Sequence, residues 1–560
     1  MIGIIKRNRP GLAGFVLIFL AALVSMAGAQ DKVNPGLEAA PLNPEYFQYL
    51  EDVDSGKISL ETADGYSLGS IPPHIDIDYA SRLSAAREKP RISLPASYDL
   101  RTLGKVSSVK NQGNCGACWS FATLGALESN LLTGESWDFS ENNMKNTHGF
   151  DIGCCAGGNT FLSTAYLTRW SGPIKESDDP YNDDETQCVS PPGLTPQKHL
   201  QEVIWFPKKT SALDNDAIKQ AIMTYGGVHV SMCWTDPSYN AANAAYYYTG
   251  TENVGGHAVL AVGWDDNFDK NNFNTPPPGN GAFLIKNSWD TTFGQSGFFY
   301  ISYYDSKMGY RNFQSIYTAA ESTSNYEHFY YYDPLGNCDN VGAQKPEAWF
   351  GNVFTAAGNE QIKAVAWFVM APNATYEIKV YLDPSSGPIN PAGHASLKTG
   401  TNTTMGYKTI LLDTPVSLSP GQKFSVVVKQ TTPGYNYPIP VEYPISQFSS
   451  KADASAGQSY ISLDGSNFSD LTTQTGFEKA NVCLRVYSKS SSGKMCGDCN
   501  GDGKVTPGDA QWAFECYLGQ HSGGDCDPSF TDVNSSGGIT PEDAQAVFDN
   551  WLKGTALNCP

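Results

Sequence analysis

Residues 109–127 read VKNQGNCGACWSFATLGAL and place two cysteines, Cys115 and Cys118, just before a segment with helical spacing of apolar residues. Three interpretations compete for this pair: a redox couple, half of a zinc site, or a catalytic thiol beside a structural one. A zinc site requires two more ligands at a matching spacing, and the adjacent Cys154 and Cys155 are poorly placed to supply them. Residues further along the chain must decide among the three.

A catalytic thiol needs a base, a group that orients the base, and donors for an oxyanion, and the chain offers a candidate for each. His257 lies in GGHAVLAVGW, a strand-like run that can hold the ring in place. Asn287 lies in LIKNSW, and the following Trp289 can shield an Asn–His hydrogen bond from water. Gln112 lies shortly before Cys118, within reach of a carbonyl oxygen at that thiol. Taken singly, the histidine and the asparagine are equally well explained as structural residues, but together with the thiol they indicate nucleophilic catalysis.

These motifs resemble those of the papain-like cysteine proteases. The family signature CG[SA]CW is present as CGACW at residues 115–119, and the order Gln, Cys, His, Asn also matches. The spacing between His257 and Asn287 is longer than usual for the family, and an inserted loop at 266–281 accounts for it. The resemblance implies an α+β protease domain over residues 94–320, with a helical lobe and a β-barrel lobe.

The resemblance also implies a mechanism for an endopeptidase. Cys118 begins a helix, and the helix dipole together with a protonated His257 favours the thiolate. The thiolate attacks a peptide carbonyl, the Gln112 side chain and the Cys118 backbone N–H hold the oxyanion, and a thioester acyl-enzyme forms. His257 protonates the leaving amine, and Asn287 orients the imidazole. No metal or organic cofactor is expected for catalysis.

Further residues acquire roles from the same resemblance. Gly157 and Gly158 match positions at which family members bind the substrate backbone as an extended strand, and Trp289 joins them as a substrate-binding residue. Protein or peptide substrates are therefore expected.

The resemblance also implies two disulfides. Cys115 takes the place of the structural thiol of the family, whose partner precedes two glycines, so a Cys115–Cys155 bond is expected, with Cys154 then paired to Cys188. The chain has 13 cysteines, so one catalytic thiol leaves 12 for pairing. The partners of the others stay open: Cys233, Cys338, Cys483, Cys496, Cys499, Cys516, Cys526 and Cys559.

The chain of 560 residues carries a net charge of -20, which argues against nonspecific nucleic-acid binding. A basic stretch at 6–9, an apolar run at 12–26 and Ala-Gly-Ala at 27–29 predict a signal peptide over residues 1–29. An uncleaved membrane anchor is the alternative, although the run is short for a span. We therefore expect a secreted protein, extracellular or associated with the cell surface, with disulfides and no membrane span after signal cleavage.

Four more regions follow from changes in pattern. Residues 30–93 are polar, lack a long apolar periodicity and the helical signature of common papain-like propeptides, and are interpreted by position as an inhibitory pro-segment. Residues 325–487 contain short strand-like runs typical of a β-sandwich and resemble the lectin-like domain that follows papain-like domains in some prokaryotic peptidases. This domain either binds carbohydrate or packs on the protease. Residues 488–495 are a linker by composition, and 496–555 form a separate small module.

The small module contains two similar acidic loops, each followed by an apolar helical run that begins TPGDAQWAF at Thr506 and TPEDAQAVF at Thr540. Oxygen ligands at positions 1, 3, 5 and 12 indicate calcium, whereas a solvated acidic turn is the alternative for a single copy. No helix is expected before either loop and position 12 is Asp, so the module resembles a dockerin type I repeat, which implies a cohesin-bearing partner or scaffold. The expected ligands are Asp498, Asn500, Asp502 and Asp509 in the first loop and Asp532, Asn534, Ser536 and Asp543 in the second, weaker one.

Two rival functions remain at this stage. One is an adhesion or carbohydrate-binding protein that uses an inactive protease fold as a scaffold. The other is a papain-like acyl transferase such as a transglutaminase, which usually has Asp in place of Asn287. The presence of Cys118, His257, Asn287 and Gln112 together favours the peptidase.

Overall fold

The computed structural model describes most of the chain after the expected signal peptide. The described residues are 36–79, 93–132, 134–252, 254–490, 496–500, 505–521, 526, 528–555 and 557–558. The signal peptide, most of the linker, Asp502 and Cys559 lie outside these residues. Among the described helices, none has the length and apolar character needed to cross a membrane.

The helical part of the protease domain is organised by α3 (Cys118–Leu131). This helix is buried from Cys118 to Ser129, because its sequence is apolar or small on all faces. The helix expected to begin at Cys118 is confirmed. The other helices of the domain are α4 (Glu141–Thr147), α5 (Thr160–Thr168) and α6 (Asp216–Tyr225).

The second lobe is a set of mostly antiparallel strands centred on β7 (Gly256–Asp265). β7 pairs with β8 (Ala282–Lys286) in antiparallel register. The start of β7, which carries His257, therefore lies at the same edge of the sheet as the end of β8, which leads into Asn287. The remaining strands are β2 (Ser97–Asp99), β3 (His199–Phe206), β4 (Val228–Cys233), β5 (Tyr239–Asn240), β6 (Ala245–Tyr246), β9 (Phe298–Ser302) and β10 (Gln314–Glu321).

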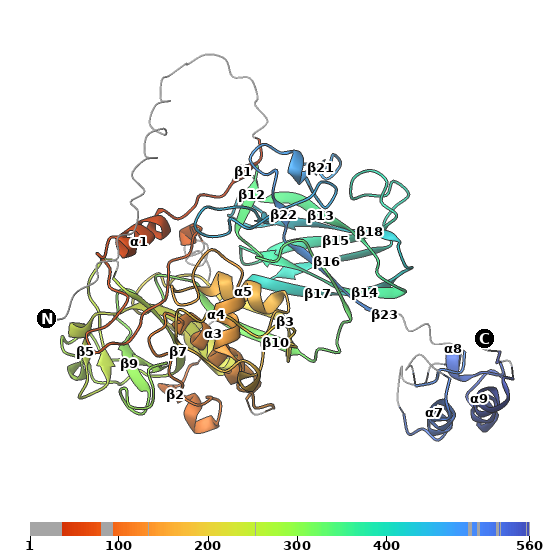
Figure 1. Cartoon of the computed structure of the whole chain (residues 1–560), viewed down its shortest axis with the longest axis horizontal. Helices are drawn as coiled ribbons and strands as arrows, with labels where there is room; N and C mark the ends of the chain where they lie inside the picture. Colours follow the sequence, from red (N-terminus) through yellow and green to blue (C-terminus); the bar gives the residue numbers. More distant parts are fainter. Residues whose placement is uncertain are drawn as a thin grey trace, which may run out of the picture. The chain divides into compact units, whose positions relative to one another are not determined.

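Residues 328–490 form a β-sandwich with its own apolar core, as the strand pattern predicts (Figure 1). One sheet has the order β16-β15-β18-β13-β20-β21, and strands β11-β23-β14-β17 belong to the sheet that also contains the protease strands. The strands are β11 (His328–Tyr330), β12 (Asp339–Gly342), β13 (Glu347–Thr355), β14 (Glu360–Val369), β15 (Ala374–Leu382), β16 (Ser396–Asn402), β17 (Met405–Leu418), β18 (Lys423–Thr431), β19 (Ile439–Glu442), β20 (Ser459–Ser462), β21 (Ser469–Asp470), β22 (Asn481–Val482) and β23 (Leu484–Ser490).

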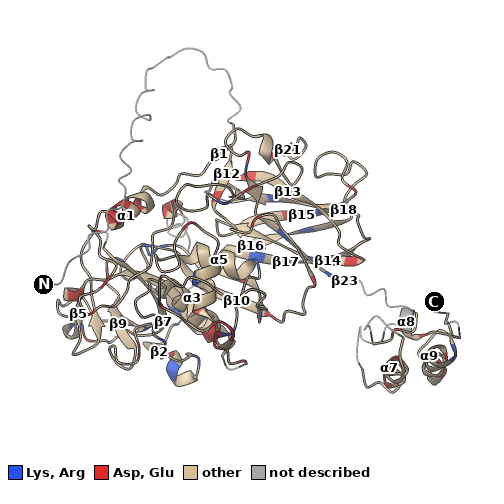
Figure 2. Cartoon of the chain, viewed as in Figure 1, with Lys and Arg blue, Asp and Glu red and all other residues tan. Residues whose placement is uncertain are grey.

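The sandwich contacts the protease domain through pairing of backbone strands and through a buried arginine. β17 pairs with β3, so that one sheet of 13 strands continues from one domain into the other. Arg485 of β23 is fully buried, forms an ion pair with Asp333 at 2.9 Å, and donates a hydrogen bond to the Thr168 hydroxyl of α5 at 2.8 Å. The packing role considered for this domain is thus observed. Elsewhere, Lys and Arg are dispersed among Asp and Glu along the described ribbon (Figure 2).

The pro-segment is more ordered than its polar sequence suggests. It contains β1 (Glu38–Ala39) and a helix, α1 (Pro44–Asp54), which the sequence reading did not foresee. The local signals are present: Asn43 caps the helix, Pro44 occupies its first turn, and the helix buries Tyr46 and Tyr49. The helix has only three turns, and its two buried apolar side chains are phenols, so it shows little apolar periodicity.

The described part of the pro-segment, residues 36–79, also contacts the sandwich near both of its ends. β1 pairs with β12 in antiparallel register, and the Tyr79 hydroxyl donates to the Met370 carbonyl at 2.7 Å. The His74 ring stacks on Phe448 with ring centroids 3.5 Å apart. The chain between these anchors crosses the protease domain.

The small C-terminal module contains α7 (Pro507–Tyr517), α8 (Pro528–Thr531) and α9 (Pro541–Lys553). α7 and α9 each begin with a capping box, in which Thr506 pairs with Asp509 and Thr540 with Asp543. The expectation that no helix precedes either loop is wrong for the second loop, because the single-turn α8 ends directly before Asp532. Pro528 starts this turn, and four residues are too few to show a periodic pattern.

Candidate active site

Cys118, His257 and Asn287 come together where α3 meets the edge of the β7–β8 pair. The His257 Nε2 lies 2.7 Å from the Asn287 Oδ1, and the Ala258 backbone N–H donates to the Cys118 sulfur at 3.3 Å. Within the described structure, the other ring nitrogen of His257 has no hydrogen-bond partner, so it is free to exchange a proton. This arrangement provides a thiol, a base and a group that orients the base.

Trp289 covers the hydrogen bond between the histidine and the asparagine. Its ring is fully buried and stacks on the His257 ring, with centroids 4.4 Å apart and an interplanar angle of 20°. The Asn287 Oδ1 also accepts the Ser288 backbone N–H at 2.8 Å. The imidazole is therefore held in one orientation and shielded from water on one face.

Gln112 is oriented by a residue that the sequence reading missed. The Ser288 hydroxyl donates to the Gln112 Oε1 at 2.7 Å, which turns the Gln112 NH₂ group toward the cleft. That NH₂ group donates to the Ser67 carbonyl at 3.0 Å and to the Cys115 carbonyl at 2.9 Å. A donor that grips a carbonyl oxygen is what oxyanion stabilisation requires. Ser288 lies in the NSW motif, and its place directly after Asn287 was the available signal.

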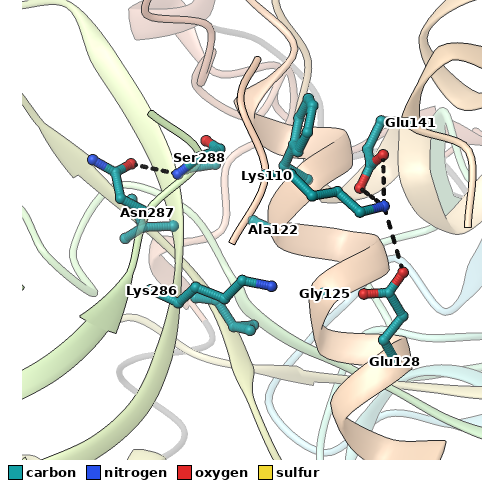
Figure 3. Close-up of a pocket in the computed structure, with 12 residues that line it drawn as sticks. Lys110, Ala122, Gly125, Glu128, Glu141, Lys286, Asn287 and Ser288 are labelled. Carbon is teal, nitrogen blue, oxygen red and sulfur yellow. Dashed lines mark hydrogen bonds and ion pairs between the residues drawn. The ribbon is translucent and has the colours of Figure 1, made fainter. Parts of the chain in front are cut away.

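A buried group of charges lies behind the site (Figure 3). The Lys110 Nζ lies 3.0 Å from Glu141 and 3.7 Å from Glu128 of α3. Burial lowers the pKa of Lys110, but the surrounding carboxylates outweigh this effect and raise the pKa overall. Lys286, next to Asn287, faces the same small cavity. The ion pairs of Lys110 thus tie α3 to α4 behind the thiol.

Gly157 and Gly158 line the cleft as expected, and an extended chain already occupies it. The Gly158 N–H donates to the Gly69 carbonyl at 2.8 Å, and the Gly158 carbonyl accepts the Ile71 N–H at 3.1 Å. A Cβ on Gly158 would lie 2.5 Å from the Trp119 ring, so no other residue fits without displacing the indole. Gly157 has φ of +107°, which also favours glycine.

The bound chain is the pro-segment itself. Ser70 forms a parallel bridge with Gly158, and the Ser70 N–H donates to the Gly256 carbonyl at 2.9 Å. Tyr66 stacks on Trp289 with ring centroids 4.7 Å apart. A Cβ on Gly69 would lie 1.9 Å from the Gly116 carbonyl oxygen, so this residue passes directly over the motif that contains Cys118. In this form of the chain the cleft is closed to any other peptide.

Covering the site changes its protonation. Burial raises the pKa of the Cys118 thiol to about 12, and burial lowers the pKa of His257 to about 4. At neutral pH both groups are therefore neutral, in contrast to the thiolate and imidazolium expected from the sequence for the working enzyme. The covered site therefore lacks the ionised groups that catalysis needs, and it is also closed to substrates.

Two disulfides join the loops next to the thiol. Cys115 is bonded to Cys155, and Cys154 to Cys188. In the small module Cys516 is bonded to Cys526, and Cys496 is also disulfide-bonded. Of the cysteines whose pairing the sequence leaves open, three within the described residues are buried and reduced: Cys233, Cys338 and Cys483.

The two acidic loops of the small module have matching geometry. The position-12 carboxylate of each loop accepts the N–H of the position-3 asparagine, from Asn500 to Asp509 at 3.0 Å and from Asn534 to Asp543 at 3.2 Å. The described residues contain no cluster of three His, Cys, Asp or Glu side chains that could hold a metal, and Asp502 lies outside them. The donors in both loops are carboxylate, amide and hydroxyl oxygens, which is the set that calcium prefers.

Comparisons with known proteins agree with this geometry. Residues 94–318 match the profile of the papain family cysteine proteases, and residues 329–488 match the profile described as a lectin like domain. The cysteine protease and lectin-like domains of Cwp84, a surface layer associated protein of Clostridium difficile, have a similar structure. The TM-score is 0.69 at 27% sequence identity, and the match covers 81% of this chain and 99% of that one.

Curated relatives are similar over the protease domain. The cathepsin L-like peptidase of Aedes aegypti is 31% identical over 220 residues, which are 38% of this chain and 60% of that protein. The viral cathepsin of Bombyx mori nuclear polyhedrosis virus is 32% identical over 223 residues, 39% of this chain and 62% of that protein. The match thus spans about three fifths of these relatives. Cathepsin K of Gallus gallus is 31% identical over 266 residues, 43% of this chain and 72% of cathepsin K. On these matches, the chain belongs to the papain family of cysteine proteases.

Proposed function

We propose that the chain is a secreted cysteine endopeptidase made as a self-inhibited precursor. The observation that carries this proposal is the cleft itself, in which an extended chain lies against Gly158 while its carbonyl is gripped by Gln112 beside Cys118. Hydrolysis of a peptide by the processed chain, blocked by a thiol-reactive epoxide, is the test. A processed chain that folds but cleaves no peptide would instead favour an adhesion protein built on a protease fold.

The proposed reaction uses groups already in place. Once the pro-segment has left, solvent reaches Cys118 and His257, and the proton moves from sulfur to the imidazole. The thiolate attacks the peptide carbonyl, and the Gln112 NH₂ and the Cys118 N–H hold the oxyanion. His257 gives its proton to the leaving amine, and water then releases the acyl group from sulfur. Asn287 keeps the ring in the orientation that both proton transfers need.

Inhibition by the pro-segment follows from the same contacts. The segment fills the cleft, engages the oxyanion donor, and keeps the thiol protonated by burial. Its described part is held on the sandwich by β1 and Tyr79, so the lectin-like domain helps to hold the inhibitor in place.

Replacing Gly69 by alanine is expected to make Cys118 accessible in the unprocessed precursor. The new Cβ would collide with the Gly116 backbone, so the pro-segment must lift from the motif and expose the thiol. Alkylation of Cys118 in the unprocessed chain, followed by mass spectrometry, should be at least 10-fold faster than in the parent precursor. Gly36→Ala is the matched control, because a Cβ there has open space. Equal alkylation rates in the Gly69 variant and the parent would contradict this role of the segment.

The small module is proposed to be a calcium-dependent tether to a cohesin-like partner. Calcium would be held by the eight residues predicted from the repeat, and when bound it would fix the loops against α7 and α9. Each helix also exposes three large apolar side chains at corresponding positions of the repeat. They are Phe514, Tyr517 and Leu518 on α7 and Phe548, Trp551 and Leu552 on α9, all at least 38% exposed. Such duplicated apolar surface is suited to a protein partner. Carbohydrate binding by the lectin-like domain is a further proposed interaction.

Titration of the full chain with Ca²⁺ is expected to show two sites, with the second loop weaker because Ser536 replaces a carboxylate. Asp509→Asn should weaken the first site by roughly 10-fold or more, since a bidentate carboxylate is lost. Asp549→Asn is the control, because Asp549 lies on α9 outside the loop and pairs with Lys553. Isothermal titration calorimetry measures calcium binding to both variants. Unchanged binding in the Asp509 variant would show that calcium is held elsewhere.

A further inference from the structure

A buried guanidinium lies beside the cleft, and two of its three nitrogens are unpaired among the described atoms. Arg311 is only 6% exposed, and its Nη1 lies 3.0 Å from the Cys233 sulfur and 3.1 Å from the Val254 carbonyl. The Nε and Nη2 atoms have no hydrogen-bond partner among the described atoms. Nor does any carboxylate in the described part of the chain form an ion pair with this side chain. A buried cation without an anionic partner is costly and points to a ligand that completes it.

The guanidinium faces the bound chain directly. A Cβ built on Gly256 would lie 2.7 Å from the Arg311 Nη1 and 2.0 Å from the Ser70 carbonyl oxygen. Arg311 and the peptide that occupies the cleft therefore lie on the same side of Gly256, the residue before His257. Glycine at this position leaves the space between them open. A side chain of the peptide at this register can reach the guanidinium.

The pro-segment already places a side chain there. The guanidinium carbon lies 4.8 Å from the centre of the Tyr49 ring, and Tyr49 is 1% exposed. Burial raises the pKa of the Tyr49 hydroxyl, and the adjacent Arg311 acts in the opposite direction. When the pro-segment leaves, a space the size of a phenol opens over Arg311. The neutral phenol leaves the positive charge of the guanidinium uncompensated.

We propose that Arg311 is a specificity residue of the peptidase and binds the carboxylate of an Asp or Glu side chain of the substrate, on the residue that pairs with Gly158. A carboxylate can engage the unused Nε and Nη2 together, in the bidentate geometry that guanidinium favours. The inference rests on the peptidase function proposed above and adds its substrate class: peptides with an acidic residue before the cleaved bond, at the position that pairs with Gly158.

Because the chain is acidic overall, a preference for an acidic substrate side chain would identify a local cation. With a net charge of -20, the protein repels acidic peptides at long range. A preference for an acidic side chain must therefore come from a local cation. Lys307, on the same loop, donates to the Thr251 carbonyl at the surface and serves as a control for nonspecific attraction.

The test compares peptides that differ only by Glu or Gln at each of four positions before the cleaved bond, with the processed full chain as enzyme. Active sites are counted by epoxide labelling of Cys118. We expect kcat/KM for Glu to exceed that for Gln by at least 10-fold at one position, about 1.4 kcal/mol. Arg311→Met should bring this ratio to about 1, whereas Lys307→Met should leave it unchanged.

Several outcomes would overturn the assignment. Cleavage of the Gln peptides without a Glu preference at any position would refute it, and so would a preference for Tyr over Glu at the responsive position. These results come from the unmodified enzyme, so they stand even if the Arg311 variant fails to fold. A complete lack of cleavage of every peptide would instead refute the peptidase function itself.

Discussion

Replacing Cys118 by alanine is expected to lower kcat of the processed chain by at least roughly 10⁴-fold, because the nucleophile that forms the acyl-enzyme is lost. The substitution removes one buried sulfur from the start of α3 and leaves the hydrogen bond between His257 and Asn287 intact. Substrate binding should persist, since Gly158 and Gln112 are unchanged. Steady-state hydrolysis of a fluorogenic peptide gives the rate. A binding competition with the same variant gives its affinity for the peptide.

The matched control for this experiment is another buried thiol. Cys483 is also reduced and fully buried, but it lies between β22 and β23 of the sandwich. Cys483→Ala should keep the rate per active site of the parent, even if the melting temperature falls. If Cys118→Ala retained the parent rate, or if Cys483→Ala lost it, the assignment of the nucleophile would be wrong.

Gln112→Ala is expected to reduce turnover by roughly 100-fold or more, because a single oxyanion donor contributes on that scale. The Gln112 NH₂ group already grips the Ser67 carbonyl, and Ser288 fixes its direction. The loss should appear in kcat rather than in KM, since the donor acts mainly on the charged intermediate. Single-turnover and steady-state kinetics on one peptide separate the two parameters.

Two variants control for indirect effects of the Gln112 substitution. Ser288→Ala should reduce kcat by less than Gln112→Ala, since the amide stays but loses the bond that orients it. Gln187→Ala changes an exposed loop glutamine and should have no effect. A loss of only a few-fold in Gln112→Ala, with a normal melting temperature, would show that the oxyanion is held by other donors.

The local features of the protease domain could be predicted from sequence because they are encoded locally. The apolar run of α3 and the strand-like run around His257 are each contained in one short, continuous stretch of sequence. The order of the four motifs then specifies one fold, and the antiparallel pairing of β7 with β8 brings His257 and Asn287 to one edge. The sandwich was likewise visible from short apolar runs separated by turn residues.

The features that were missed depend on contacts between distant segments. β17 of the sandwich pairs with β3 of the protease, and neither strand carries a signal for its partner. The path of the pro-segment through the cleft rests on backbone hydrogen bonds of Gly69, and such bonds leave no periodic pattern in the sequence. Arg311 looks like an ordinary loop residue in the sequence. Only the fold shows that its guanidinium is buried next to Gly256.

The most direct test of the account is to treat the processed chain with a thiol-reactive epoxide and to locate the adduct by mass spectrometry. The predicted result is a single adduct on Cys118, formed in parallel with the loss of peptidase activity and much more slowly in the unprocessed chain. The buried thiols Cys233, Cys338 and Cys483 should stay unmodified. An adduct on any other residue, or full activity after Cys118 has been modified, would contradict the proposed mechanism.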